Sequence, residues 1–206
     1  MRAWRVIPFL QSMLGRAAAC LVIVVVSLIY RLYQSPALME PDVRCPASSA
    51  QLSQDLGAYI ASASAAAVAA RGSFVIALSG GSLPQAIASA LAAAASAGAA
   101  VPPIAFDRWL VVYADERIVP LDHADSNHRA CVAALSDTPL LPSQFLAIDP
   151  HLAPTECARD YESRLRAAMH CNDASLTPQL DLVLLGMGPD GHTASLFPGA
   201  ASVTMA

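Results

Sequence analysis

Three short apolar runs, each followed at once by a polar or glycine-bearing segment, constrain the fold of this 206-residue chain most strongly. The runs read FVIAL (74–78), WLVVY (109–113) and LDLVLL (180–185), and helix-prone stretches separate them. Strands that are apolar on both faces and alternate with helices indicate a parallel sheet covered on both sides. The sequence therefore predicts an α/β fold.

The remaining segments supply helices for both faces of such a sheet. We expect a linker rich in Pro and Ser at 34–50, and a further short strand at Phe145–Ile148. Pro84 is well placed to open a helix, because proline is tolerated in the first helical turn. The predicted helices span residues 51–70, 84–97, about 127–135 and 154–170.

The polar segments that follow the strands predict where the site lies. They are Ser79–Ser82, Asp115–Arg117 and Gly186–His192. In parallel α/β sheets, ligands bind outside the carboxyl ends of the strands. These three segments, distant in sequence, are therefore expected to meet along one edge of the sheet.

Composition excludes several kinds of chemistry and partner. All 12 basic residues are arginine, so lysine Schiff bases, pyridoxal-phosphate lysines and Walker-type phosphate loops are excluded. Residues 39–206 carry 8 arginines against 16 acids, and an acidic body without a basic patch argues against nucleic acid as a partner. The five cysteines form no C-x-x-C pair, which favours a reducing compartment such as the cytoplasm over a disulfide framework or a zinc site.

The first 38 residues differ from the rest, because they contain four arginines and no acid. Residues 17–30 are uncharged and apolar but shorter than the roughly 20 residues that span a bilayer. The segment is open to three interpretations: a targeting segment (signal peptide or organellar presequence), a retained membrane anchor, or a dispensable extension with Met39 as the working start. We thus divide the chain into an extension, 1–38, and a domain, 39–206, with membrane contact expected only if 17–30 is an anchor.

The glycine segment after the first strand is a candidate phosphate loop. Gly80, Gly81 and Ser82 precede a helix start, where glycines let a ligand approach the backbone and the N–H groups favour an anion. A simple tight turn is the structural alternative.

The acidic segment after the second strand is a candidate substrate contact. Arg117 can bind phosphate or carboxylate bidentately, and Asp115 and Glu116 can orient it or contact sugar hydroxyls. A surface ion-pair cluster is the alternative. The nearby acids and histidines lack matched metal-ligand spacing, so a solvated loop is expected and no metal site is assigned. They are Asp122, His123, Asp125 and His128.

The third segment matches G-x-G-x-x-G at 186–191, but the dinucleotide interpretation fails. Pro189 and Asp190 lie where a pyrophosphate needs small residues and available amides, and no acidic ribose partner follows about 20 residues later. Asp190 and His192 instead suggest a general base, because an adjacent carboxylate can fix the tautomer of an imidazole that titrates near neutral pH. A structural histidine is the alternative.

Together these segments resemble the 6-phosphogluconolactonases. The matching stretches are ALSGGSLP (77–84), ADERIVPLDHADSN (114–127) and LDLVLLGMGPDGHTASLFPG (180–199), and the similarity covers about residues 43–200. The related glucosamine-6-phosphate deaminases are less similar, since they usually have a tyrosine where Arg117 stands and a different sequence after His192.

The resemblance implies a Rossmann-like sheet of the sugar-phosphate isomerase type, with no cofactor and no metal. It implies hydrolysis of the small-molecule substrate 6-phospho-D-glucono-1,5-lactone, with His192 as the base that activates water and Asp190 orienting it. Substrate-binding positions are implied at Gly80, Gly81, Ser82, Asp115, Arg117 and Asn127, the last with a helix-start role as an alternative.

Two further functions stay open at this point. One is a sugar-phosphate isomerase or deaminase, and the other is a non-catalytic sugar-phosphate binder. The second follows from a departure from the family pattern: the sequence stops soon after Pro198, so we expect the sheet to be incomplete at its C-terminal end.

Overall fold

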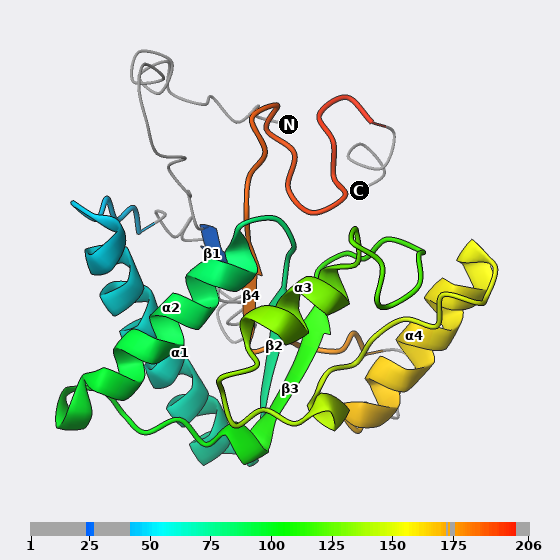
Figure 1. The fold of residues 1–206 in the computed structure, drawn as a ribbon. Helices are drawn as coiled ribbons and strands as arrows, with labels where there is room; N and C mark the ends of the chain where they lie inside the picture. The colour runs from blue at the N-terminus through cyan, green and yellow to red at the C-terminus, as the bar shows by residue number, and fades with distance from the viewer. Residues whose placement is uncertain (1–23, 27–41, 172, 174–175, 201–206) are drawn as a thin grey trace, which may run out of the picture.

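A computed structural model describes residues 24–26, 42–171, 173 and 176–200 (Figure 1). Its elements follow the alternation of strands and helices expected from the sequence, with three short 3₁₀ turns between them. The strands and α-helices are β1 (Val24–Val26), α1 (Ser49–Arg71), β2 (Phe74–Leu78), α2 (Leu83–Ser96), β3 (Trp109–Tyr113), α3 (Asn127–Ala134), α4 (Pro154–Ala168) and β4 (Leu182–Leu185).

The sheet has the strand order β1-β4-β2-β3, and β2 pairs in parallel with both β3 and β4. The parallel sheet predicted from the three apolar runs is confirmed. In register, Leu78 lies beside Tyr113 on one side and beside Leu184 on the other, so the three strands end together. The short strand β1 pairs antiparallel with β4 and was not expected from the sequence.

The predicted strand at Phe145–Ile148 is wrong. Phe145 forms only an isolated parallel bridge with Val111, where the N–H of Leu146 donates to Val111 O at 2.9 Å. Farther along β3, the N–H of Tyr113 donates instead to the hydroxyl of Tyr161 on α4, at 3.1 Å. A helix side chain therefore satisfies the edge donor that a continuing strand would have used.

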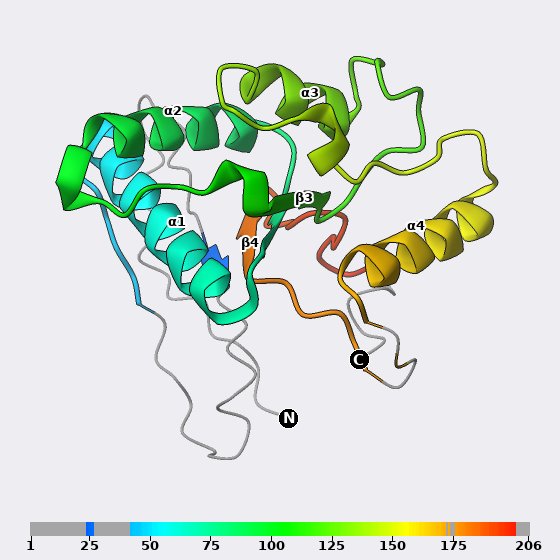
Figure 2. The same ribbon diagram turned by 90° about the horizontal axis from the view of Figure 1, so that it is seen from below.

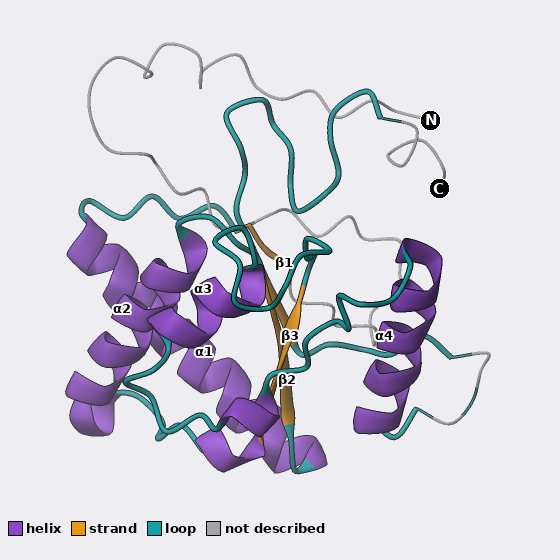
Figure 3. Ribbon diagram, turned by 45° about the vertical axis from the view of Figure 1, so that its right-hand side comes forward, coloured by secondary structure: helices purple, strands orange, loops and turns teal. Residues whose placement is uncertain are grey.

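Helices α1, α2 and α3 lie on one side of the sheet and α4 lies on the other, as the edge-on view shows (Figure 3). The helix α1 is capped at its N-terminus by Ser48, whose Oγ accepts a hydrogen bond from the Gln51 N–H, and at its C-terminus by Gly72 with φ +76°. Gly57 lets α1 approach α2 closely, because a Cβ there would overlap with the carbonyl of Ala90.

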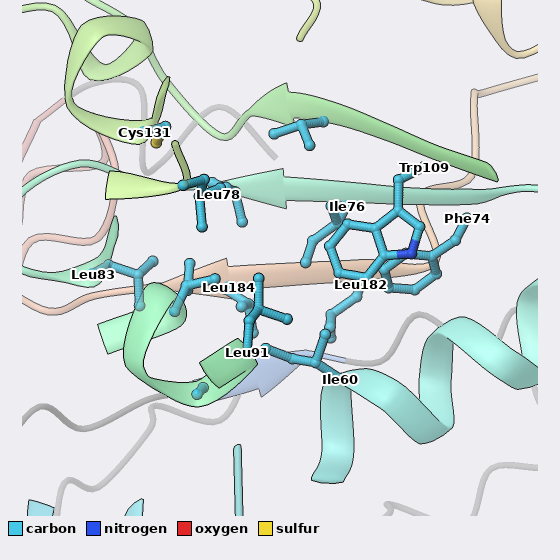
Figure 4. Packing of buried hydrophobic residues seen from close by; sticks show 14 of the residues in the cluster. Ile60, Phe74, Ile76, Leu78, Leu83, Leu91, Trp109, Cys131, Leu182 and Leu184 are labelled. Atoms are coloured by element: carbon cyan, nitrogen blue, oxygen red, sulfur yellow. The ribbon is translucent and has the colours of Figure 1, made fainter. Parts of the chain in front are cut away.

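The main core lies between this helical layer and the sheet (Figure 4). Ile60, Phe74, Ile76, Leu182 and Leu184 are each almost fully buried in it. Trp109 closes one end, and its Nε1–H donates to Ser64 Oγ at 2.8 Å, so the one polar atom of the indole is satisfied inside the core.

A smaller cluster covers the opposite face of the sheet. Val75, Ala77 and Val112 are buried there against Leu165 and Met169 from the C-terminal end of α4. Figure 2 shows α4 on the other side of the sheet from α1 and α2. At the start of β4, Asp181 accepts a hydrogen bond from the Val75 N–H at 2.7 Å and pairs with Arg71 at the end of α1. The first contact joins the start of β4 to β2, and the second joins it to α1.

Residues 1–23 and 27–41 lie outside the described residues. The expectations for the 1–38 extension therefore stay predictions; the structure describes only β1 within it, which was not among them. Within the described part of the chain, no helix combines the length and apolar character needed to cross a membrane.

Candidate active site

The carboxylate of Asp115, just after β3, joins the three loops that the sequence analysis placed at one edge. Its Oδ1 accepts hydrogen bonds from Ser79 Oγ at 3.4 Å and from Asn127 Nδ2 at 3.3 Å. Its Oδ2 accepts one from Ser195 Oγ at 2.8 Å. Ser79 follows β2 and Ser195 lies beyond β4. The loops after the three strands therefore meet at the carboxyl ends as predicted, but the third loop does so through Ser195, just past the predicted segment 186–192.

The neighbouring Glu116 is used differently from what the sequence suggested. Its carboxylate accepts hydrogen bonds from the backbone N–H groups of Asn127 and His128, each at 2.7 Å, and from that of Arg117 at 2.8 Å. The first two are unpaired donors at the start of α3, where a negative charge is stabilising. Glu116 therefore fixes the helix start that carries Asn127.

The glycine loop is packed against Asn127. Asn127 as a whole residue is only 3% exposed, and its Nδ2 also donates to the Asp115 carbonyl at 2.9 Å. A Cβ at Gly80 would overlap with Oδ1 of Asn127, and Gly81 adopts φ +69°, so both positions require glycine. Ser82 is the exposed residue that precedes α2, and its side chain makes no capping hydrogen bond.

Arg117 lies exposed at the same edge of the sheet. Its guanidinium donates to the carbonyl of Asp125 at 2.9 Å, so this carbonyl orients the side chain rather than the carboxylates of Asp115 or Glu116. The guanidinium keeps further N–H groups that can bind an anion.

His192 and Asp190 form a pair on the loop that follows β4. The ring Nδ1 of His192 lies 2.5 Å from Oδ1 of Asp190, and this hydrogen bond lowers the pKa of the Asp190 carboxyl below its ordinary value. Gly188 makes room for the pair, because a Cβ there would overlap with the imidazole ring. The ring of Phe197 stacks on the imidazole with centroids 4.7 Å apart.

This loop, residues 186–199, extends beyond the carboxyl ends of the strands (Figure 1). Among the described residues, no hydrogen bond joins the His192 and Asp190 side chains to the glycine loop or to Arg117; the loop meets the Asp115 cluster through Ser195 instead. A hollow of about 420 Å³ lies beneath it. Its lining includes Ala77, Asp115, Val183, Leu185 and the loop residues Thr193 to Leu196.

Sequence reasoning missed the contributions of Ser79, Ser126 and Ser195. Ser79 lies in the expected segment, but no contact was predicted for it. Ser126 is the N-cap of α3, a role that its place before the helix could have signalled. Nothing in the sequence marks Ser195 as a partner of Asp115, since the two are 80 residues apart.

The acids and histidines of the 115–128 loop do not gather around one point. His128 turns toward the sheet, where its Nδ1 lies 2.8 Å from the Tyr113 hydroxyl, while exposed His123 contacts the Asp125 N–H at 3.1 Å. Across the residues described, no group of three or more His, Cys, Asp or Glu side chains is arranged to hold a metal ion.

The G-x-G-x-x-G segment does not lead into a helix. Gly191 N–H donates to Gly188 O at 2.9 Å, and Thr193 and Leu196 then form a short β-bridge. A dinucleotide-binding segment requires a helix N-terminus at this point, and turns stand there instead.

Comparison with known proteins gives one matching family and several similar relatives. The family described as "Glucosamine-6-phosphate isomerases/6-phosphogluconolactonase" matches residues 47–206. A 6-phosphogluconolactonase of Rattus norvegicus is 44% identical over 153 residues, which are 71% of this chain and 57% of the relative. A protein of Oryza sativa subsp. indica named "Probable 6-phosphogluconolactonase 3, chloroplastic" is 41% identical over 154 residues, which are 72% of this chain and 46% of the relative. The chain thus spans about half the length of these curated relatives.

Solved structures show the same fold. The 6-phosphogluconolactonase of Trypanosoma cruzi superposes with a TM-score of 0.60 at 28% identity, covering 77% of this chain and 62% of that one. That of Leishmania guyanensis gives a TM-score of 0.59 at 30% identity, covering 79% and 65%. The chain belongs to the glucosamine-6-phosphate isomerase/6-phosphogluconolactonase family.

Proposed function

We propose that this protein hydrolyses 6-phospho-D-glucono-1,5-lactone to 6-phospho-D-gluconate, in the oxidative pentose phosphate pathway. The observation that carries the proposal is the hydrogen-bonded pair of His192 and Asp190 on a strand-end loop. It supports lactone hydrolysis in a chain whose relatives of 41–44% identity are named 6-phosphogluconolactonases.

The pair has the form of an oriented general base. With the Asp190 carboxylate as acceptor, Nδ1 of His192 carries the proton, and Nε2 becomes the basic atom of the neutral ring. Nε2 takes a proton from water as the water oxygen bonds to C1 of the lactone. The ring C1–O bond then breaks, the imidazolium returns its proton to the departing ring oxygen, and the new carboxylic acid ionises. Neither a covalent intermediate nor a cofactor enters this sequence.

The substrate phosphate is assigned to the glycine loop and Arg117. Gly80, Gly81 and Ser82 precede the N-terminus of α2, where unpaired backbone N–H groups favour an anion. Arg117 adds a charged donor from the neighbouring loop. Asp115 and Asn127 are assigned to the same wall of the site, where they shape the glycine loop.

The test is acid release from the lactone above its spontaneous rate. The His192→Ala variant is expected to lose the enzymatic rate by about 100-fold or more, as for removal of a general base. His151→Ala is the matched control, because His151 is an exposed histidine on the loop before α4 and makes no part of the proposed site. Wild-type protein with no rate above the spontaneous one would refute the proposal, and equal rates for the two variants would remove His192 from it.

The family name also covers glucosamine-6-phosphate isomerases, so the same samples are assayed with glucosamine 6-phosphate. We expect no ammonia release, because Arg117 and the segment after His192 match the lactonase pattern. Ammonia release without lactone hydrolysis would assign the chain to the deaminase side of the family.

We also propose that residues 39–206 form the domain and that the protein lies in the cytoplasm. The alternative is an organellar or membrane-associated location set by residues 1–38. The family match begins at residue 47, which supports the division. The chloroplastic name of the rice relative supports the alternative. Fractionation of cells that express the chain from Met1 or from Met39 tests both: a soluble cytoplasmic product from each start is expected, and recovery of only the Met1 product in organelles or membranes would favour the alternative.

A further inference from the structure

We propose that Asp115 and Ser195 are positioning residues, and that the hydrogen bond between them holds the 186–199 loop where His192 meets the substrate. The inference rests on the proposed function for its catalytic consequence. Its structural part, the restraint of the loop, is independent of that function.

Asp115 provides a fixed anchor for the loop. It lies two residues beyond β3, and its Oδ1 and its backbone carbonyl both accept from the buried carboxamide of Asn127. Asn127 is in turn held by Glu116 at the start of α3. Because these contacts engage Oδ1 from the body of the protein, the 2.8 Å bond to Ser195 is made by the remaining oxygen, Oδ2.

The backbone around Ser195 is shaped to present the hydroxyl to this anchor. Thr193 and Leu196 exchange two backbone hydrogen bonds, at 3.2 and 2.9 Å, which close a tight turn with Ala194 and Ser195 at its tip. Ala194 adopts φ +51°, a left-handed conformation that disfavours alanine. Such a residue persists where surrounding contacts hold it. The first residue of the turn, Thr193, is bonded directly to His192, so restraining the turn also restrains the imidazole.

Apolar burial contributes little to holding the loop in place. The large apolar side chains it carries are about half exposed: Met187 is 52%, Leu196 53% and Phe197 47% exposed. The hollow of about 420 Å³ also separates part of the loop from the sheet face. A hydrogen bond to a charged acceptor is therefore the main restraint that the described contacts provide.

Ser195 itself is not placed to act as a nucleophile. Its hydroxyl donates to a carboxylate that already has other donors, and no described contact joins it to the imidazole of His192. The expected effect of removing it is therefore smaller than that of removing the base.

The structural test is hydrogen exchange of the backbone amides of residues 186–199 in the full chain. Ser195→Ala is expected to speed their exchange about tenfold, while Ser195→Thr, which keeps the hydroxyl, restores protection. Ser96→Ala is the matched control, because the Ser96 hydroxyl donates only within α2, at its C-terminal end. Unchanged exchange in Ser195→Ala would overturn the proposal, whether or not the protein is a lactonase.

The kinetic test uses the lactone. Ser195→Ala is expected to lower kcat about 10- to 100-fold with little change in KM, as for a misplaced catalytic group, and Ser195→Thr is expected to recover most of it. The pH dependence of the residual activity should keep the midpoint of the wild type, because His192 still acts as the base. A loss equal to that of His192→Ala, without rescue by threonine, would mean that Ser195 takes part in the chemistry and would overturn the positioning role.

Discussion

Gly80 packs its Cα against the carboxamide of Asn127, so closely that a Cβ at position 80 would overlap with the Asn127 Oδ1 atom. Asn127 cannot easily move away, because it is 3% exposed and bonded through both its backbone and its side chain. The contact joins the loop after β2 to the start of α3.

We therefore expect Gly80→Ala to reduce the free energy of unfolding by about 1–3 kcal/mol, the usual range for overpacking. Gly186→Ala is the matched control. Gly186 also follows a strand of the sheet, yet a Cβ there would have nothing within 4 Å and its φ is not positive. Gly186→Ala should change the free energy of unfolding by no more than about 0.5 kcal/mol. Urea unfolding of the two variants measures both values, and equal stabilities would contradict the packing argument.

Gly188 lies under the imidazole of His192 in a similarly close contact, but away from the core. A Cβ at position 188 would overlap with Cε1 and Nδ1 of the ring and would lie 2.8 Å from Asp190 Oδ1. Gly188→Ala is thus expected to displace the base and lower lactone hydrolysis by about 10- to 100-fold. The free energy of unfolding should stay within about 0.5 kcal/mol of the wild-type value, since no buried side chain is disturbed.

The Gly186→Ala variant again serves as the control for this rate. It should retain wild-type hydrolysis, because position 186 contacts neither member of the pair. A Gly188→Ala enzyme with full activity would show that the ring position seen here is not needed for catalysis.

The pair of Asp190 and His192 also predicts a titration. The hydrogen bond from His192 lowers the pKa of the Asp190 carboxyl below 3.8, its ordinary value. Because the pKa of Asp190 is lower in the folded state, the pair is intact above pH 3.8. It is lost as the pH falls through the lowered pKa. Carbon-13 NMR of the carboxyl group should show a midpoint below 3.8 in the wild type and a return toward 3.8 in His192→Ala. The His151→Ala protein should titrate as the wild type does, and an unshifted wild-type midpoint would argue against the pair in solution.

The sheet was predictable because its strands are apolar on both faces. FVIAL and WLVVY became β2 and β3 with the expected bounds, and the four predicted helices begin and end within two residues of those observed. The absence of a strand at Phe145–Ile148 was not predictable. Whether a strand pairs there depends on whether another group in the chain accepts the hydrogen bonds that β3 donates at its edge. Tyr161, on a helix 48 residues from Tyr113, takes the donor that the ladder needed.

The candidate site was predictable in its location but not in its contacts. Topology alone brings the ends of parallel strands together, so the loops carrying Gly80, Asp115 and His192 had to share an edge. Which polar atoms pair there depends on distances between side chains. Thus Glu116, expected to orient Arg117, instead caps α3, and Asp115 bonds to Ser195.

His128 provides a last prediction, on stability rather than activity. It is partly buried beside Tyr113 and Phe145, and burial lowers its pKa below the ordinary 6.5, with the nearby Glu116 opposing part of the effect. Between 6.5 and the lowered value, the unfolded chain binds a proton on this ring and the folded chain does not. His128 therefore destabilises the fold as the pH falls through that window.

The expected result is a His128→Gln protein whose free energy of unfolding falls less than that of the wild type between pH 7.5 and 5.5. Glutamine keeps a hydrogen-bonding group toward the Tyr113 hydroxyl but does not titrate. His151→Gln, at an exposed position, controls for the loss of any histidine. Urea unfolding at the two pH values gives the difference directly. Parallel losses in all three proteins would show that protonation of His128 does not oppose folding in this range.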